Sequence, residues 1–142
     1  MPDHMTPEQR SNAMKRVRLK GGPLEALIQN ELRQVGLRFR RNCKEVKGSP
    51  DIVFWKEKVA IFIDGDFWHG WRLPAWEHKL SHFWRAKLQA NRRRDQRNFR
   101  RLRAAEWTVI RLWEHEIVSN AERCIGRIRK ALNNSKSLSS PS

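Results

Sequence analysis

Apolar side chains recur at helical spacing in two segments, one in each half of the chain. Between Pro23 and Gly36 the apolar positions follow an i, i+3, i+4 pattern, and Glu25 lies off that stripe. Residues 116–132 repeat the pattern. Each segment therefore predicts an amphipathic helix with one face on the core. The stripes contain Leu24, Leu27, Ile28, Leu32 and Val35 in the first helix, and Ile117, Ala121, Cys124, Ile125, Ile128 and Leu132 in the second.

Four shorter segments have the patterns of β-strands. Residues 37–41 alternate between apolar and polar, residues 51–55 and 59–63 are apolar on both faces, and residues 107–113 read WTVIRLW. The tight turn at residues 56–58 predicts that the second and third strands are antiparallel neighbours. With the helices, the order of elements predicts one α/β domain, in which a central mixed β-sheet is flanked by helices.

A long basic helical region is predicted over residues 74–105. One stripe of this helix contains Trp84, Leu88, Asn91, Asp95, Phe99 and Leu102, so Asp95 faces inward. A buried carboxylate needs a hydrogen bond or an ion pair, because leaving it isolated costs several kcal/mol. Two explanations stay open: Asp95 has a structural arginine partner, or it orients a catalytic imidazole.

Charge points to a polyanionic partner. The 142 residues include 30 Lys and Arg against 15 Asp and Glu, a net charge of +15, and much of the excess lies between Arg72 and Arg111. Nucleic acid is the expected partner, and a generally basic surface or a ribosome-type structural protein is the alternative. Two isolated cysteines signal neither a zinc ribbon nor a disulfide framework. No apolar run is long enough for a membrane span or a signal region, so we expect a cytoplasmic protein.

Two carboxylates are predicted to meet at one edge of the sheet. Asp51 begins one buried strand and Asp64 ends its antiparallel neighbour. Paired carboxylates repel each other unless a cation lies between them, and hard oxygen ligands suit Mg²⁺. His69 follows five residues after Asp64 and could act as a general base for water attack. A single histidine is more often structural, but the acids Asp51, Asp64 and Asp95 favour the catalytic interpretation.

Aromatic residues gather beside these acids. Phe67 and Trp68 lie in a turn between two glycines, and Phe83 and Trp84 begin the basic helix. Core packing is one explanation, and we assign Trp55, Trp107 and Trp113 of the strands to the core. The loop aromatics could instead stack on bases or enter a base step of duplex DNA.

These residues carry a resemblance to a known family. The run GSPDIVFWKEKVAIFIDGDFWHG, with PLEALIQNELRQVGLRFRRN before it and FWRAKLQANRRRDQRNFRRLRAAEWTVIRLWEHEI after it, resembles the very short patch repair (Vsr) endonucleases. These enzymes belong to the PD-(D/E)xK superfamily and nick DNA beside T·G mismatches. The resemblance covers residues 6–130. It implies a restriction-endonuclease-like three-layer fold and a bacterial, nucleoid-associated monomer, with mismatch-repair proteins such as MutL as partners.

The resemblance implies a role for each matching residue of the site. Asp51 matches the metal-binding aspartate of the PD motif, and the backbone carbonyl of Ile63 matches a second metal ligand. His69 matches the general base, Asp95 the acid beside it, and Glu25 an acid near the active site on the first core helix.

The resemblance also implies the contacts with DNA. Phe67, Trp68 and Trp84 match aromatics that insert beside the mismatch from the major groove. Met14 lies in an N-terminal helix that approaches from the minor-groove side, so residues 1–20 are expected to form a DNA-contacting arm before the nuclease domain of residues 21–132. The serine-rich residues 133–142 are expected to be a disordered tail. Further DNA contacts are expected from Lys15, Arg16, Arg92 and Arg93.

The chain departs from the family at its zinc site. Typical members have histidine at the position of Asp64 and cysteine at that of Asp66, and their other zinc ligands fall at Trp71, Leu73 and His115. We therefore expect no structural zinc. Asp66 is expected to pair with His115 instead.

The departures also change the expected catalytic site. Asp64 becomes a direct or water-mediated metal ligand, and His69 replaces the lysine that is usual in the superfamily. The resulting hypothesis is a Mg²⁺-dependent endonuclease that nicks one strand 5′ to the mismatched thymine of T·G, leaving a 5′-phosphate and a 3′-hydroxyl. The alternatives are a restriction-type or structure-specific nickase without T·G preference, and a non-catalytic basic DNA-binding protein.

Overall fold

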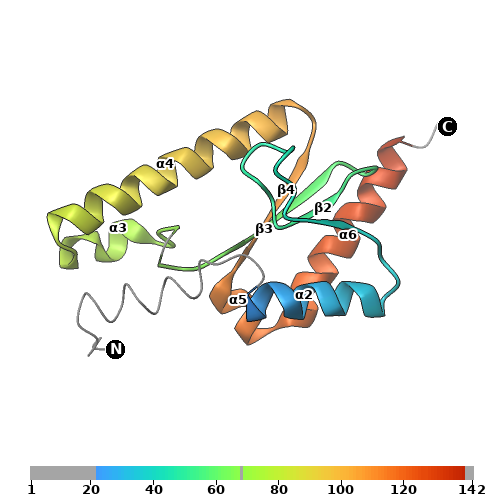
Figure 1. Ribbon diagram of the computed structural model, residues 1–142, viewed down its shortest axis with the longest axis horizontal. Coiled ribbons are helices and arrows are strands. Elements are labelled where there is room, and N and C mark those ends of the chain that lie inside the picture. The colour runs from blue at the N-terminus through green and yellow to red at the C-terminus, as the bar shows by residue number, and fades with distance from the viewer. Residues whose placement is uncertain (1–21, 68, 140–142) are drawn as a thin grey trace.

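The computed structural model describes residues 22–67 and 69–139, which form helices around a four-stranded sheet (Figure 1). The predicted arm of residues 1–20, with Met14, Lys15 and Arg16, lies outside the described residues, and so does Trp68. The elements are α2 (Pro23–Gln34), β1 (Arg40–Arg41), β2 (Ile52–Phe54), β3 (Val59–Asp64), α3 (Leu73–Trp76), η1 (Glu77–Lys79), α4 (His82–Ala104), β4 (Thr108–Trp113), α5 (Glu114–Ser119) and α6 (Ala121–Ser139).

The sheet is mixed, as the sequence predicted. Its strand order is β1-β2-β3-β4. Strands β1, β2 and β3 are antiparallel neighbours, whereas β4 pairs parallel to β3 after the crossover through α4. Ile61 in the centre of the sheet faces Ile52 on one side and Ile110 on the other. This register places the end of β3 beside the end of β4 and close to the residue that precedes β2.

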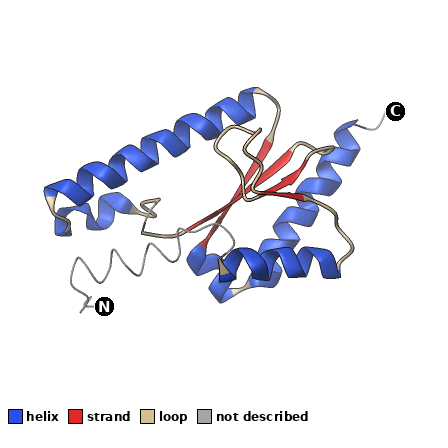
Figure 2. Ribbon diagram, in the orientation of Figure 1, coloured by secondary structure: helices blue, strands red, loops and turns tan. Residues whose placement is uncertain are grey.

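Helices cover both faces of the sheet, which gives three layers (Figure 2). Side chains alternate along the strands, so β2, β3 and β4 each contribute to both cores. On the α2 and α6 face the buried core contains Ile28, Leu32, Ile52, Phe54, Val59, Ile61, Ile110, Leu112, Ile117, Cys124, Ile125, Ile128 and Leu132. On the α4 face it contains Cys43, Val46, Val53, Ala60, Phe62, Phe99 and Leu102.

The predicted helix over residues 74–105 is broken in the structure. The chain forms the short elements α3 and η1, becomes extended at Leu80, and begins again as α4. Ser81 is the N-cap of α4, and its side chain accepts a hydrogen bond from the backbone N–H of Trp84. Serine is a preferred N-cap because its oxygen satisfies an N–H that has no partner within the helix. The cap therefore explains why the long helix begins later than predicted.

The C-terminal region also differs from the prediction of one helix followed by a disordered tail. Asn120 separates α5 from α6 and accepts a hydrogen bond from the backbone N–H of Arg123. Helix α6 continues to Ser139, beyond the predicted end at Leu132. Once a helix is anchored on a core, each further residue adds a backbone hydrogen bond at little cost, so a polar extension can stay helical.

Trp55 was wrongly assigned to the core. It follows β2 and is 44% exposed, and its ring meets that of Trp107 edge-on with Arg40 on its face. The cause is the short length of β2, which ends at Phe54. No helix of the described residues is long and apolar enough to cross a membrane.

Candidate active site

All five predicted catalytic residues line one cavity of about 510 Å³. The cavity lies between α2, the start of β2, the end of β3, and α4. The five residues are Glu25, Asp51, Asp64, His69 and Asp95. Four of them are carboxylates that are at most 8% exposed.

Asp51 and Asp64 lie on the α4 face of the sheet. The backbone N–H of Asp51 donates to the carbonyl of Ile61, and Asp51 Oδ2 accepts the backbone N–H of Ile63 at 2.7 Å. Asp51 therefore bridges β2 and β3 at the end of β3, where Asp64 is the last residue. The strand geometry brings the two acids together as the sequence predicted.

His69 lies in the loop after β3, between two acids. Its Nδ1 is 2.6 Å from Asp95 Oδ2, and its Nε2 is 3.3 Å from Asp64 Oδ1. The imidazole is three-quarters buried. An Nδ1–H that donates to Asp95 leaves Nε2 as the proton acceptor on the side of Asp64 and the cavity.

A glycine allows this loop to approach α4. Gly70 has φ of +68°, and a Cβ at this position would lie 2.8 Å from Cδ of Arg92. Only glycine combines the left-handed conformation with the space for the Arg92 stem. The backbone N–H of His69 donates to the carbonyl of Gly65 and closes the turn.

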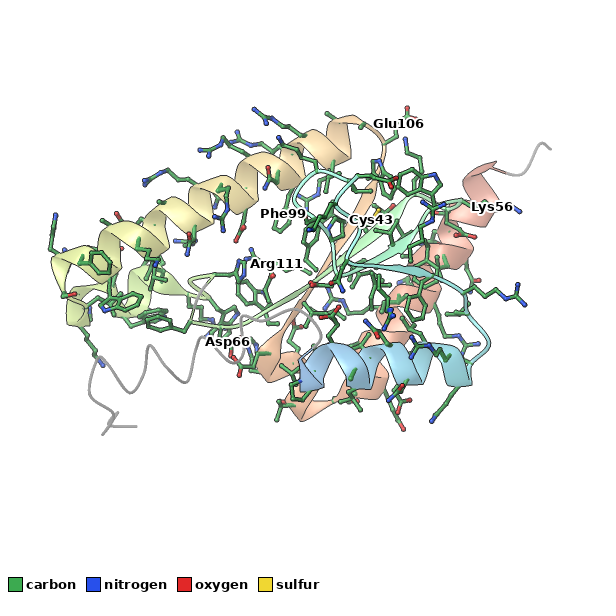
Figure 3. All side chains as sticks on the ribbon, viewed as in Figure 1. Cys43, Lys56, Asp66, Phe99, Glu106 and Arg111 are labelled. Carbon is green, nitrogen blue, oxygen red and sulfur yellow. The ribbon has the colours of Figure 1, made fainter. Side chains whose placement is uncertain are left out.

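Asp95 has both of the partners that the sequence left as alternatives. One oxygen, Oδ2, lies 2.6 Å from His69 Nδ1 and accepts a hydrogen bond of 2.9 Å from Arg111 Nη2. Arg111 also donates from Nε to Asp64 Oδ2 at 2.7 Å. Figure 3 shows Arg111 in the space between α4 and the sheet, below Phe99.

Sequence reasoning missed Arg111 as part of the site. It was counted with the basic surface, although a signal was present. In β4, residues 109, 111 and 113 alternate with the buried Ile110 and Leu112, which face the α2 and α6 side. Strand periodicity therefore places Arg111 on the α4 face, opposite the inward Asp95.

Glu25 reaches the cavity from the first turn of α2. It is 5% exposed, and its Oε1 accepts a hydrogen bond from Gln29 Nε2 at 3.2 Å. Its position off the apolar stripe explains this placement, because that side of α2 faces the cavity. The helix packs on α5 and α6 through its other side.

An aromatic cluster lies next to the site, where the loop after β3 packs on α3 and the start of α4. The ring of Phe67 stacks on Trp76 and meets Trp84 edge-on, at centroid distances of 5.9 and 5.6 Å. Phe83 is 64% exposed and contacts Trp84. Two of the predicted DNA-contacting aromatics, Phe67 and Trp84, are therefore brought together. Lys87 lies over the Trp84 ring and makes the cluster cationic.

The two predicted DNA-contacting arginines of α4 differ in their exposure to solvent. Arg92 is half-buried because its stem packs on Gly70, whereas Arg93 is exposed.

Comparisons with known proteins place this geometry in a family. A family model described as DNA mismatch endonuclease Vsr matches residues 2–74. The chain is 37% identical to the type II nicking enzyme V.NmeDIP of Neisseria meningitidis serogroup C, with 96% of this chain and 95% of the relative covered. The chain belongs to the Vsr family of DNA endonucleases. The predicted family is confirmed, and the non-catalytic alternative is wrong.

Two other relatives carry different functional names, one as a nicking enzyme and one as a mismatch endonuclease. The chain is 37% identical to the type II nicking enzyme V.HpaIIP of Haemophilus parainfluenzae, with 92% of this chain and 95% of the relative covered. It is 31% identical to the DNA mismatch endonuclease Vsr of Escherichia coli K12, with 74% and 69% covered.

The predicted pair of Asp66 and His115, at positions where the resemblance implies zinc ligands in typical family members, is present. His115 Nδ1 lies 2.9 Å from Asp66 Oδ1, and the His115 ring lies 4.2 Å from that of Trp71. The backbone N–H of Asp66 also donates to Glu114 Oε1. These contacts join the loop after β3 to the start of α5, so the loop that carries Phe67 and His69 is held at its base.

The donor set of the site fits a hard divalent cation, as in a metal-dependent Vsr-family nuclease. Asp51, Ile63 and Asp64 line the cavity, and the two carboxylates are buried. They could supply two carboxylates and a backbone carbonyl as oxygen ligands. Among the described residues, no three His, Cys, Asp or Glu side chains form a group that could hold a metal ion by themselves. Mg²⁺ suits such a site, because it binds through one or two carboxylates and keeps waters or phosphate oxygens as its other ligands.

Proposed function

We propose that this protein nicks one strand of duplex DNA 5′ to the mismatched thymine of a T·G pair, in a Mg²⁺-dependent reaction. The products are a 5′-phosphate and a 3′-hydroxyl. The observation that carries the proposal is the placement of His69 between Asp95 and Asp64 in the cavity that also contains Asp51.

The residues of the cavity divide the chemistry. Asp95 holds the imidazole at Nδ1, so His69 accepts a proton at Nε2 from the water that attacks phosphorus. A new bond forms between the water oxygen and phosphorus while the bond from phosphorus to the 3′-oxygen breaks. Asp51, the Ile63 carbonyl and Asp64 would hold Mg²⁺, whose charge stabilises the phosphoryl transition state when it is bound.

The aromatic cluster supports recognition of a distorted duplex. Phe67 and Trp84 lie in one cluster on the loop and helix that border the catalytic cavity, and Lys87 lies over the Trp84 ring. Aromatic wedges unstack base steps at a cost of a few kcal/mol per step, and that cost is lower at a mismatch. Recognition by wedging therefore favours a mismatched site over a paired one.

A second candidate follows from the relatives with the higher identity. Both relatives described above at 37% identity are named type II nicking enzymes, whereas the Escherichia coli relative at 31% identity is named a mismatch endonuclease. The second candidate is a nickase that requires a DNA sequence but no T·G pair. It has the same chemistry and differs only in the substrate.

A nicking assay on matched duplexes separates the two candidates. One labelled sequence would be prepared fully paired and with each mismatch, and incubated with and without Mg²⁺. We expect nicking only with Mg²⁺ and fastest at T·G, on the strand that carries the thymine. Equal rates on paired and T·G duplexes would reject the mismatch proposal and leave the second candidate.

A variant of the first metal ligand tests the chemistry. Asp51→Asn should reduce the nicking rate by about 10²-fold or more, because it removes a charged oxygen ligand at the reacting phosphate. The matched control is Glu122→Gln, which removes an exposed carboxylate from α6. Wild-type nicking by Asp51→Asn would refute the assigned site.

A further inference from the structure

Arg111 is the one permanently charged side chain that contacts two of the catalytic carboxylates within the described part of the chain. It lies in the fourth position of β4, where it faces Phe62 of β3 in the parallel register. Its side chain is 21% exposed. The proposed chemistry assigns no role to this residue.

The proposed general base His69 and three other side chains form a closed ring. Arg111 bonds Asp64 through Nε at 2.7 Å and Asp95 through Nη2 at 2.9 Å. His69 contacts the same two acids, with Nε2 3.3 Å from Asp64 Oδ1 and Nδ1 2.6 Å from Asp95 Oδ2. The guanidinium therefore bridges the two carboxylates that flank the imidazole, and the positions of both acids relative to His69 depend on it.

Aromatic rings hold the guanidinium in place independently of the acids. Its central carbon lies 4.1 Å from the ring centroid of Trp113 and 5.0 Å from that of Phe99. A planar guanidinium can stack on such rings while it donates two hydrogen bonds in its plane. Lysine has neither the plane nor the fixed fork, so this position requires arginine for both contacts.

The positive charge of Arg111 also reduces the repulsion between the buried carboxylates. Asp51, Asp64 and Asp95 are buried around one cavity, where like charges repel strongly. The guanidinium is always protonated, and its single positive charge offsets one of the two negative charges of Asp64 and Asp95. The cavity, which Asp51 also lines, therefore keeps a net negative charge that favours a divalent ion.

We propose that Arg111 is a positioning residue that fixes Asp64 and Asp95 at the two nitrogens of His69, and that it acts as a resident cation in place of a second divalent ion. The site then takes one divalent ion only. This inference rests on the proposed nuclease function for its kinetic consequence, but its prediction for ion binding is independent of any substrate.

The test counts bound ions in three variants without DNA. Mn²⁺ is the probe, because it accepts the same carboxylate and carbonyl ligands as Mg²⁺ and its free form is counted by electron paramagnetic resonance. We expect the wild type to bind one Mn²⁺. Arg111→Met should bind a second ion or bind the first at least about tenfold more tightly, because the removed charge repels the ion across a few ångströms.

The matched control is Arg103→Met. Arg103 also lies over the Phe99 ring, at 6.0 Å, and is exposed, and it has no ion pair among the described residues. It should bind Mn²⁺ as the wild type does. Arg111→Lys keeps the positive charge but loses the two fixed N–H donors of the guanidinium. It should therefore still bind one Mn²⁺.

Nicking should change in the opposite direction to ion binding. Under single-turnover conditions Arg111→Met should nick at least about 10²-fold more slowly with unchanged DNA affinity, because His69 loses its fixed acids. Arg111→Lys should recover part of that rate. A general loss of structure would weaken ion binding and nicking together, so the opposed changes distinguish positioning from damage.

Each outcome decides the inference. Two ions in the wild type, or Arg111→Met with the ion binding of Arg103→Met, would overturn it. If Arg111→Met does not fold, as judged by circular dichroism and urea unfolding, Arg111→Lys decides: full wild-type nicking by that variant would overturn the positioning role. If the wild type nicks no duplex, the proposed function fails, while the ion count still tests the resident cation.

Discussion

Replacing Asp95 tests the geometry of the general base most directly, and two replacements separate its charge from its shape. One oxygen, Oδ2, contacts both His69 and Arg111. In Asp95→Asn the amide oxygen can occupy that position and keep both contacts without the charge. In Asp95→Ala no acceptor is left, so His69 Nδ1 and Arg111 Nη2 both lose a partner in a largely buried site.

The expected magnitudes follow from these contacts. A hydrogen bond to a charged group contributes about 1.5–3 kcal/mol and a neutral one about 0.5–1.5, and only the His69 contact becomes neutral because Arg111 keeps its charge, so the loss is about 1 kcal/mol. If this loss falls on the transition state, Asp95→Asn nicks about fivefold more slowly. Asp95→Ala also releases the imidazole, and general-base positioning is worth about 10²–10⁴-fold.

Stability should follow the same order. Removing one partner of a buried ion pair costs about 3–5 kcal/mol. His69 and Arg111 are 25% and 21% exposed, so water replaces part of the lost contact and we expect about 2–3 kcal/mol for Asp95→Ala. Asp95→Asn should cost less, because both hydrogen bonds can remain.

Single-turnover nicking of a T·G duplex and urea unfolding measure the two effects. The control is Gln96→Ala, which changes an exposed side chain one residue further along α4. We expect the rates to fall in the order wild type, Asp95→Asn, Asp95→Ala. Equal rates for the two variants would show that charge alone matters, and a wild-type rate for Asp95→Ala would refute the assignment of His69 as an oriented base.

Three further predictions concern the surroundings of the site. Gly70→Ala should lower the free energy of unfolding by about 1–2 kcal/mol in urea, because φ is +68° and the added methyl meets Arg92; a wild-type midpoint would show that the loop adapts. Asp66→Asn and His115→Gln should couple by only about 0.2–1 kcal/mol in a double-mutant cycle, because the pair is about one-third exposed, and a larger coupling would contradict that screening. Burial raises the pKa of the Cys124 thiol above its ordinary value, so the stability it contributes is present below that value and is lost as pH rises through the folded-state pKa. Cys124→Ala should therefore flatten the alkaline fall of the urea midpoint, and an unchanged slope would show that other groups cause it.

Periodicity predicted the acids of the site well, because each one lies in a regular element. Asp51 precedes one strand and Asp64 ends the next, and a tight turn joins these two strands. The proximity of the two carboxylates therefore follows from strand pairing alone. The helical stripe that contains Leu88 and Phe99 placed Asp95 inward, and both apolar neighbours are buried. Such arguments need only the period of the element and no knowledge of its surroundings.

Arg111 and the helix boundaries needed information from the whole fold. The alternation of β4 was visible, but only the parallel pairing with β3 brings Arg111 beside Asp64. The break before α4 depends on a cap at Ser81, and the extension of α6 to Ser139 depends on anchoring by the core. In each case the outcome was decided by packing or by one local hydrogen bond that apolar periodicity does not report.

The charge distribution suggests how the enzyme separates binding from cutting. The chain has a net charge of +15, which attracts DNA from any direction, whereas five carboxylates line the catalytic cavity. Arg111 and Arg94 offset two of these five charges, so without a bound cation the cavity still repels a phosphate. On the proposed function, a duplex can bind to the basic surface without placing its phosphodiester in the site, and a divalent ion held by Asp51 would favour entry of that group. We propose that DNA binding and cleavage in the cavity are then separate events, so variants of Asp51 should still bind the duplexes that they do not cut.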